Sequence, residues 1–222
     1  MSFNIAIDGP AGAGKSTIAK QLAKELSFIY VDTGAMYRSM ALYFMRNGIA
    51  KEDEAAISDA CKTVEVSIAY ENGEQQVLLN GENVSKEIRK EEVGKMASAT
   101  SVYKEVRKKL VELQQKLAAD KDVIMDGRDI GTCVLPNAQV KIYLTASVET
   151  RAERRYQELL EKGAACDLEE MSKKDIADRD YQDMHREISP LKQAEDAILV
   201  DSSDMGIEEV VETIKNIYRE KC

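Results

Sequence analysis

Five short apolar segments along the chain have the pattern of buried β-strands. They span residues 4–8 (NIAID), 28–32 (FIYVD), 122–126 (DVIMD), 139–145 (QVKIYLT) and 197–201 (AILVD). Between them lie segments with helical spacing of apolar residues, as at Ile18, Leu22 and Leu26 after the first strand. Nearly continuous apolar strands that alternate with helices are typical of a parallel sheet that is covered on both faces. The pattern therefore predicts an α/β fold with a central five-stranded parallel sheet flanked by helices.

The region from about residue 63 to residue 84 departs from this rhythm. Four apolar side chains alternate there with more polar ones: Val64, Val66, Ile68 and Tyr70. Two Asn-Gly pairs, at 72–73 and 80–81, flank a second apolar run. Because Asn-Gly between such runs is a hairpin signal, we expect a small antiparallel β insertion here. Two amphipathic, charged segments follow at residues 85–100 and 104–119.

The stretch GPAGAGKST at residues 9–17 fits the phosphate-loop pattern G-x-x-x-x-G-K-[ST]. It lies between the first predicted strand and a predicted helix, which is the context that such a loop requires. Its backbone N–H groups and the start of the helix attract phosphate, Lys15 is expected to reach the β- and γ-phosphates, and Ser16 is expected to bind Mg²⁺. We therefore assign nucleotide binding to Gly9, Pro10, Ala11, Gly12, Ala13, Gly14, Lys15, Ser16 and Thr17.

Asp126 ends the third predicted strand, where an acidic residue can hold Mg²⁺ directly or through water. The alternative is that Asp126 only caps the turn that follows. Gly127 and Arg128 come next, where helicase-like or transporter-like hydrolases usually carry a glutamate that activates water. The chain also lacks the Asn-Lys-x-Asp motif that reads guanine in GTPases. Both absences argue against water as the phosphoryl acceptor.

Arginines recur near the predicted strand ends and on the segments that leave them: Arg38, Arg107, Arg128, Arg151, Arg154, Arg155, Arg179 and Arg186. Arginine suits the planar, bidentate recognition of phosphate. Arg151 and Arg155 are four residues apart on one predicted helix face, so they are candidates to neutralise a migrating phosphoryl group. The alternative is that they form ion pairs that hold helices in place. Residues 32–38 leave the second predicted strand and residues 126–132 leave the third, and the carboxyl ends of the strands line the ligand crevice of such a sheet, which indicates a site for two anions.

Composition excludes several other classes of protein. The 222 residues carry a net charge of −9, which argues against long nucleic acids as partners. The four cysteines are scattered and there is a single histidine, so a zinc site is not expected. No segment approaches the roughly 18 apolar residues of a membrane span, and no basic-then-apolar leader precedes the first strand. We expect a cytoplasmic protein without a membrane partner.

Together, the motifs resemble those of the bacterial cytidylate kinases, a family of nucleoside monophosphate kinases, over nearly the whole chain. The resemblance is carried by IDGPAGAGKST, VDTGAMYR, the β insertion after Cys61, NGENVSKEIR, DGRDIGT, VKIYLTAS, the R-x-x-R-R segment at 151–155, and DRDYQDMHR followed by SPL. It implies a phosphate-loop (P-loop) NTPase fold, a single P-loop kinase domain over residues 1–222, an acceptor lobe at 33–100 that contains the β insertion at about 63–84, and a short lid at 151–167. The sequence Lys162-Gly163-Ala164 is the expected tip of the lid.

The same resemblance implies an activity and roles for individual residues. Members of the family transfer the γ-phosphoryl group of ATP, with Mg²⁺, to CMP or dCMP. Carried over, Lys15, Arg128, Arg151, Arg155, Arg179 and Arg186 form the catalytic set, and Ser16 and Asp126 hold the metal. Thr33, Arg38, Ser98, Arg107, Arg128, Asp129 and Asp183 bind the acceptor: Arg38 and Arg128 hold its phosphate, Ser98, Arg107 and Asp129 read the cytosine, and Asp183 contacts the sugar.

One segment departs from the family, because Gln182 and Met184 stand where relatives are more basic. The neighbouring His185 is interpreted as incidental, because phosphoryl transfer depends on positioning rather than on an imidazole base. Two alternatives stay open from the residues alone. The acceptor could be another monophosphate, UMP or AMP, or the chain could be an ATP-dependent switch or hydrolase. A monomer is expected, since no strong apolar patch is evident in the sequence.

Overall fold

The computed structural model describes residues 2–161 and 168–222, and of residues 168–172 it describes only the backbone. The predicted tip of the lid, Lys162–Ala164, therefore lies outside the described residues. The first part of the predicted lid forms most of helix α6 (Val148–Glu161).

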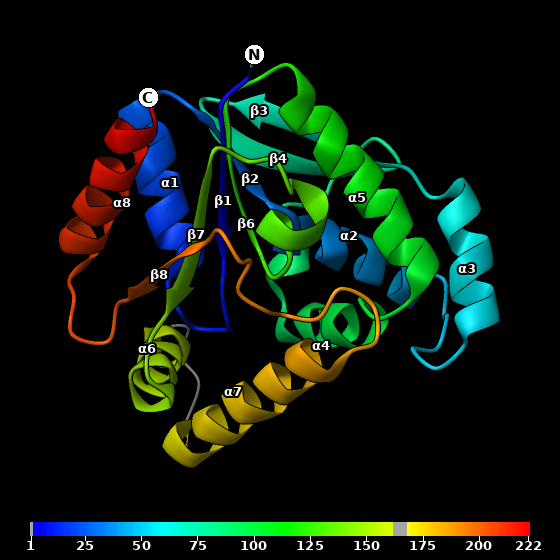
Figure 1. Cartoon of the computed structure of the whole chain (residues 1–222). Helices are drawn as coiled ribbons and strands as arrows, with labels where there is room; N and C mark the ends of the chain where they lie inside the picture. Colours follow the sequence, from blue (N-terminus) through cyan, green and yellow to red (C-terminus); the bar gives the residue numbers. More distant parts are fainter. Residues whose placement is uncertain (1, 162–167) are drawn as a thin grey trace. The chain divides into compact units, whose positions relative to one another are not determined.

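The five predicted strands all form and belong to one sheet (Figure 1). Their order is β2-β6-β1-β7-β8, and their bounds are β1 (Asn4–Asp8), β2 (Ile29–Asp32), β6 (Val123–Gly127), β7 (Val140–Thr145) and β8 (Ile198–Asp201). Ile7 of β1 lies opposite Ile142 of β7, which in turn lies opposite Ile198 of β8, and both pairings are parallel. The predicted parallel five-stranded sheet is confirmed.

The chain divides into two compact units, which are described in turn. The first consists of Met1–Ser2 and Ile29–Val123, and the second of Phe3–Phe28 and Ile124–Cys222. Helices of the first unit are α2 (Thr33–Arg46), α3 (Glu54–Thr63), α4 (Glu91–Thr100) and α5 (Lys104–Ala119). Those of the second are α1 (Lys15–Leu26), α6, α7 (Leu168–His185) and α8 (Ile207–Lys221).

Within the first unit, residues 66–83 form the antiparallel sheet that the Asn-Gly pairs predict. Its strands β3 (Val66–Glu71), β4 (Glu74–Leu79) and β5 (Glu82–Asn83) follow one another in chain order. Asn72, Gly73, Asn80 and Gly81 all have positive φ, as a two-residue hairpin turn with this handedness requires. The segment that follows is not one continuous helix, because a 3₁₀ turn (Glu87–Arg89) precedes α4.

A side chain of β4 connects this small sheet to the end of β2. The amide group of Gln75 accepts a hydrogen bond from the backbone N–H of Asp32 at 2.8 Å and donates one to its carbonyl at 3.2 Å. The carboxylate of Asp32 accepts from the backbone N–H of Ala35 at 2.9 Å and so caps α2. Its second oxygen pairs with Arg89 at 3.0 Å. The start of α2 is therefore fixed by β4 and by the 3₁₀ turn.

In the second unit, α1 and α8 lie side by side, as Figure 1 shows, and pack against β1 and β7 respectively. Edge-to-face contacts among Phe3, Phe28 and Tyr218 join the ends of these elements. The apolar face of α8 supplies the buried residues Val210, Val211 and Ile214.

Candidate functional site

The predicted phosphate loop connects β1 to α1, as its sequence context requires. Gly9 has a φ of +151°, and a Cβ at this position would overlap the carbonyl oxygen of Leu144 in β7. Gly12 has a φ of +76°, and a Cβ there would lie 3.1 Å from the Cβ of Arg151 in α6. Only glycine fits both positions, because each combines an unusual backbone angle with a close neighbour.

Lys15 is the first residue of α1, and only 6% of it is exposed. Its Nζ donates a hydrogen bond of 2.7 Å to the carbonyl oxygen of Pro10, across the loop. Burial, followed by the nearby charge of Arg128, lowers the pKa of Lys15 to about 7. A lysine in this state gains full charge when an anion approaches.

Ser16 and Asp126, which the sequence proposed as metal ligands, are brought together. The hydroxyl of Ser16 donates to a carboxylate oxygen of Asp126 at 2.8 Å, and Asp126 is buried. Mg²⁺ prefers hard oxygen ligands and usually keeps several waters beside one or two carboxylates and substrate phosphates. A hydroxyl and a carboxylate this close together are suitable ligands for such an ion. In the part of the chain that the structure describes, no group of three or more acidic, histidine or cysteine side chains forms a denser metal site.

Asp8, the last residue of β1, was not among the predicted site residues. It is 5% exposed, and its two carboxylate oxygens accept hydrogen bonds of 2.7 Å from the backbone N–H groups of Ile130 and Gly131. Burial raises its pKa to about 6, although these two hydrogen bonds act in the opposite direction. The available signal was an acidic residue in the last position of a buried strand.

The turn after β6 and helix α7 exchange several charged contacts. Nε of Arg128 donates to Asp183 at 2.7 Å. Arg186 pairs with Asp129 at 3.3 Å and lies 3.7 Å from Asp183. Burial by itself would raise the pKa of Asp183, but Arg128 and Arg186 hold it below the ordinary value. Four residues that the sequence predicted for the site, Arg128, Asp129, Asp183 and Arg186, therefore form one connected group.

Arg179 of α7 lies near two arginines and near two aspartates, Asp175 and Asp183, and the two kinds of residue act on its pKa in opposite directions. Its pKa is lowered, first by burial and then by the charge of Arg128, and Arg155 acts in the same direction. No hydrogen bond or ion pair of Arg179 is found among the described residues. A buried arginine without such a partner has donors available for an anion.

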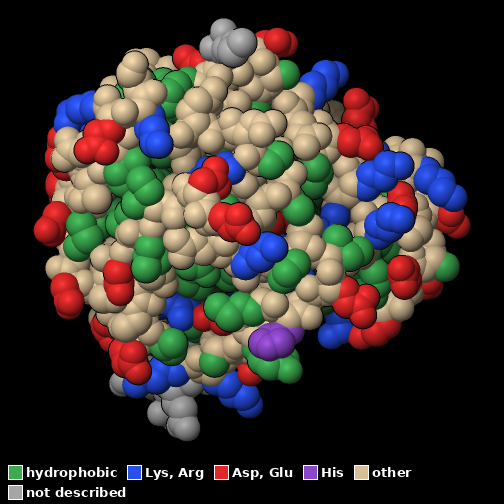
Figure 2. Space-filling model, in the orientation of Figure 1, with side chains coloured by type: hydrophobic (Ala, Val, Ile, Leu, Met, Phe, Trp, Pro, Cys, Tyr) green, Lys and Arg blue, Asp and Glu red, His purple; other side chains and the backbone are tan. Residues whose placement is uncertain are grey.

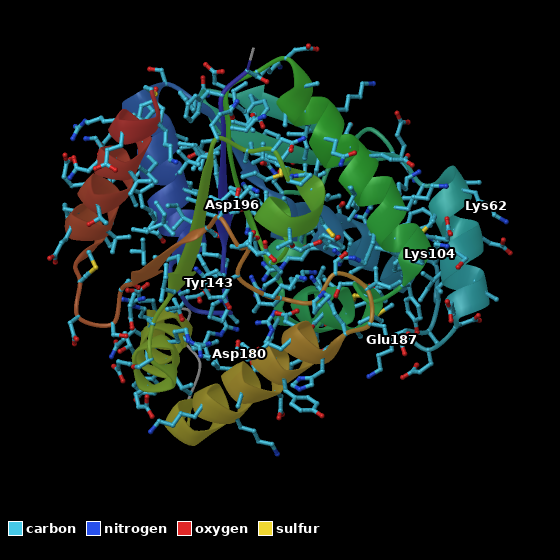
Figure 3. The ribbon with its side chains drawn as sticks, in the orientation of Figure 1. Lys62, Lys104, Tyr143, Asp180, Glu187 and Asp196 are labelled. Carbon is cyan, nitrogen blue, oxygen red and sulfur yellow. The ribbon has the colours of Figure 1, made fainter. Side chains whose placement is uncertain are left out.

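Arg151, at the start of α6, is fully engaged with protein groups. It is 4% exposed and donates to the carbonyl oxygens of Ala146 and Ala11, both at 3.0 Å. It also pairs at 2.7 Å with Asp180, which lies on the side of α7 turned toward Tyr143 of β7 (Figure 3). Arg151 thus links the phosphate loop to α7.

The next arginines of α6 are placed differently. Arg154 donates to the carbonyl oxygens of Ala13, at 3.5 Å, and Ser202, at 2.8 Å, and so also holds the loop. Arg155 pairs with Glu158 at 2.9 Å at the surface, whereas its Nε is buried without a hydrogen-bond partner among the described residues. Arg151 and Arg155 share a helix, but only Arg155 has bonding capacity to spare.

The remaining predicted residues belong to the first unit. Thr33 is the buried first residue of α2, and Ser98 is half-buried on α4. The guanidinium of Arg38 passes close to Gly94 of α4, where a Cβ would lie 3.7 Å from it. Arg107 of α5 is 3% exposed, lies over the ring of Tyr37 at 5.8 Å from the centroid, and donates to the carbonyl oxygen of Ser101 at 3.3 Å.

The only histidine, His185, lies exposed at the surface (Figure 2). Its ring stacks on that of Tyr181. Its Nδ1 lies 2.8 Å from the carbonyl oxygen of Tyr181, and within the described part of the chain no hydrogen bond joins it to a predicted site residue.

Among the described residues, no helix has the length and apolar character needed to cross a membrane.

Comparison with known proteins places the chain in a family. The family model described as "Cytidylate kinase" matches residues 5–220. A cytidylate kinase of Caldicellulosiruptor bescii is 50% identical over 216 residues, which cover 97% of this chain and 95% of that protein. A cytidylate kinase of Leuconostoc mesenteroides subsp. mesenteroides is 51% identical and covers 97% of this chain and 96% of its own length. Among solved structures, a shikimate kinase from Bacteroides thetaiotaomicron is similar in fold, with a TM-score of 0.50, 12% identity and 98% of each chain covered.

Proposed function

Because the chain belongs to the cytidylate kinase family, we propose that it transfers the γ-phosphoryl group of ATP to CMP or dCMP, giving CDP or dCDP and ADP. The reaction belongs to pyrimidine nucleotide metabolism. The expectation that the acceptor is a nucleotide rather than water agrees with the family. We further propose that the enzyme is a cytoplasmic monomer that works without a nucleic-acid or membrane partner.

ATP is bound by the phosphate loop, Gly9–Thr17, through backbone N–H groups and Lys15. Ser16 and Asp126 hold Mg²⁺, which neutralises charge on the phosphates when it is bound. Arg155, Arg179 and Arg128 face the charge that develops on the phosphoryl group, with Arg186 beside them, and Arg151 serves transfer by holding the phosphate loop in place. The segment 151–167 acts as a lid over this site and excludes water during transfer.

The acceptor is held by its phosphate and by its base. Arg38 and Arg128 bind the phosphate of CMP, beside Thr33, and Asp183 binds the sugar. Arg107 donates to the O2 and N3 acceptors of cytosine, with Ser98 near them, and Asp129 accepts from the N4 amino group. Segment 33–100, with its antiparallel sheet, serves as the acceptor lobe of a single kinase domain.

The observation that carries the proposal is the gathering of Lys15, Arg128, Arg155 and Arg179 near one another, among the carboxylates of Asp126 and Asp183. Burial and Arg128 lower the pKa values of both Lys15 and Arg179. Several cationic side chains held close together favour a ligand with several negative charges. A phosphoryl group between two nucleotides is such a ligand, whereas a lone water molecule is not.

A coupled assay with CMP, dCMP, UMP, AMP and GMP as acceptors tests the proposed activity. We expect rapid ADP formation with CMP and dCMP, slow formation with the others, and almost none without an acceptor. Steady ATP hydrolysis in the absence of any monophosphate would favour a switch or a hydrolase instead. Preference for UMP or AMP would keep the kinase chemistry and change the acceptor.

Base choice is expected to depend on Asp129. UMP presents O4 where CMP has an amino group, so a carboxylate loses its donor and faces an acceptor; an unmatched buried polar group costs roughly 1–3 kcal/mol. Asp129→Ala should therefore lose CMP activity and shrink the CMP-to-UMP preference in kcat/KM by about tenfold or more. Arg38→Ala is the matched control, because a phosphate ligand serves both nucleotides and should leave the preference unchanged. Equal loss on CMP and UMP in Asp129→Ala would refute the base-reading role.

A further inference from the structure

The carboxylate of Asp8 connects two segments that lie far apart in sequence. Asp8 directly precedes the phosphate loop, whereas its two partners, Ile130 and Gly131, follow the predicted base-reading residue Asp129. Both hydrogen bonds measure 2.7 Å, and Asp8 is 5% exposed. A carboxylate buried to this degree needs hydrogen-bond partners. Both oxygens of Asp8 find them in two consecutive backbone N–H groups of one turn.

That turn is a single turn of π-helix, Ile130–Val134, and it begins at Asp129. The carbonyl oxygen of Asp129 accepts from the N–H groups of Cys133, at 2.9 Å, and Val134, at 3.2 Å. As at the start of any helix, the first N–H groups find no acceptor inside the turn. Asp8 accepts from these N–H groups and acts as a helix cap supplied by a different strand.

The approach of Asp8 leaves little freedom to the turn. A Cβ at Gly131 would lie 3.2 Å from Cδ of Lys141 and 3.4 Å from the carboxylate of Asp8. Lys141 is itself held by Asp196 (Figure 3), whose carboxylate lies 2.8 Å from Nζ of Lys141. The side chain of Asp129 makes no capping hydrogen bond to this turn. The backbone N–H of Ile130 donates to Asp8 instead.

We infer that Asp8 is a positioning residue for base selection: its carboxylate fixes the turn that begins at Asp129 and thereby sets the preference for CMP over UMP. The inference rests on the proposed role of Asp129. Asp8 itself touches no substrate. A hydrogen bond to a base edge weakens steeply when its angle or length changes. A small rotation of the turn would therefore reduce the preference for CMP over UMP without unfolding the protein.

The test compares Asp8→Asn with the wild-type enzyme on CMP and UMP. The asparagine keeps the size of the side chain but turns an NH₂ group toward one of the two N–H groups, so one hydrogen bond becomes a repulsive contact. We expect the CMP-to-UMP ratio of kcat/KM to fall about tenfold and the KM for CMP to rise, while the KM for ATP stays within about twofold. The Val211→Ala variant in α8, which removes buried apolar contacts only, is the control: it should lower the melting temperature and keep the ratio.

Other outcomes overturn the inference. A rise in the KM for ATP with an unchanged CMP-to-UMP ratio means that Asp8 serves the phosphate loop. A lower melting temperature with normal kinetics means that its role is only structural. Failure of the wild-type enzyme to prefer CMP would instead refute the proposed function, and so the two failures can be distinguished.

A measurement on the wild-type enzyme keeps the inference testable if Asp8→Asn does not fold. The amide resonances of Ile130 and Gly131 are expected to shift together as the carboxylate of Asp8 titrates, since both amides donate to it. An Asp129 side-chain resonance should follow the same transition if the turn transmits the change. Independent behaviour of these three signals would contradict the positioning role.

Discussion

Lys15 shows how one residue can be prepared for a charged ligand. Nearly complete burial and the proximity of Arg128 lower its pKa to about 7, and its Nζ meanwhile donates to the loop carbonyl of Pro10. Both protonation states are then populated near neutral pH before a nucleotide binds. Phosphate oxygens favour the charged form, so nucleotide binding should raise this pKa again.

We therefore predict that nucleotide binding takes up a proton at pH 8. A lysine with a pKa near 7 is about 90% neutral at that pH, whereas ADP is already fully ionised, so the uptake approaches about one proton. Calorimetric titration with ADP in two buffers of different ionisation enthalpy measures it. Lys15→Arg is the control, because a guanidinium stays charged throughout and should show no uptake. Heats of binding that do not depend on the buffer in the wild-type protein would contradict the prediction.

At the scale of an element, helix α6 carries arginines with two different tasks. Arg151 is buried and bonded to the phosphate loop and to Asp180, and Arg154 holds the loop and Ser202. Arg155, one residue further, makes only a surface pair with Glu158 and has a buried Nε without a partner among the described residues. The helix therefore supports the loop with one set of side chains and offers another to a phosphoryl group.

These contacts lead to opposite expectations for two alanine variants. Arg151→Ala leaves Asp180 buried without its cation, which typically costs about 3–5 kcal/mol, so its melting temperature should fall. Arg155→Ala should keep the melting temperature and lower kcat by at least about tenfold, with little change in the KM for CMP.

Melting temperature and steady-state kinetics on the same preparations separate the two. Glu158→Gln serves as the control for Arg155, because it removes the surface partner and leaves the guanidinium in place. Normal turnover in a stable Arg155→Ala protein would exclude Arg155 from phosphoryl transfer.

For the whole molecule, the buried carboxylate of Asp8 links stability to pH. Its pKa is raised from 3.8 to about 6, with burial as the main cause, Asp129 acting in the same direction and Lys15 against it. A raised pKa means that the native state binds the proton more tightly than the unfolded chain. The resulting stability is complete below pH 3.8 and is lost as the pH rises through 6.

We predict that the free energy of unfolding of wild-type protein, relative to Asp8→Asn, falls by up to about 3 kcal/mol between pH 4 and pH 7.5. Asparagine does not titrate, so the comparison removes the contributions of other groups that both proteins share. Urea unfolding at a series of pH values measures the difference. A difference that stays constant with pH would show that Asp8 does not titrate in this range.

Much of the architecture could be predicted from short stretches of sequence. Buried strands, the phosphate loop and the Asn-Gly hairpins each depend on the spacing of a few neighbouring residues, and all of them form. Strand ends differ from the prediction by at most one residue, and the segment 85–100 proved to be a 3₁₀ turn followed by a helix. Motifs in these segments were also specific enough to indicate the family that the comparisons support.

The tertiary structure alone decided how the charged residues of the second unit act on one another. Asp8 lies more than a hundred residues from its partners Ile130 and Gly131, and no local pattern connects them. Arg151 and Arg155 read as equivalent in sequence, but only the packing of α6 buries the first against Ala11. Likewise, the lowered pKa of Lys15 requires both its burial and the approach of Arg128. Local patterns encode backbone conformation because it is set by nearest neighbours, whereas charge, burial and hydrogen bonding depend on which distant segments the fold brings within a few ångströms.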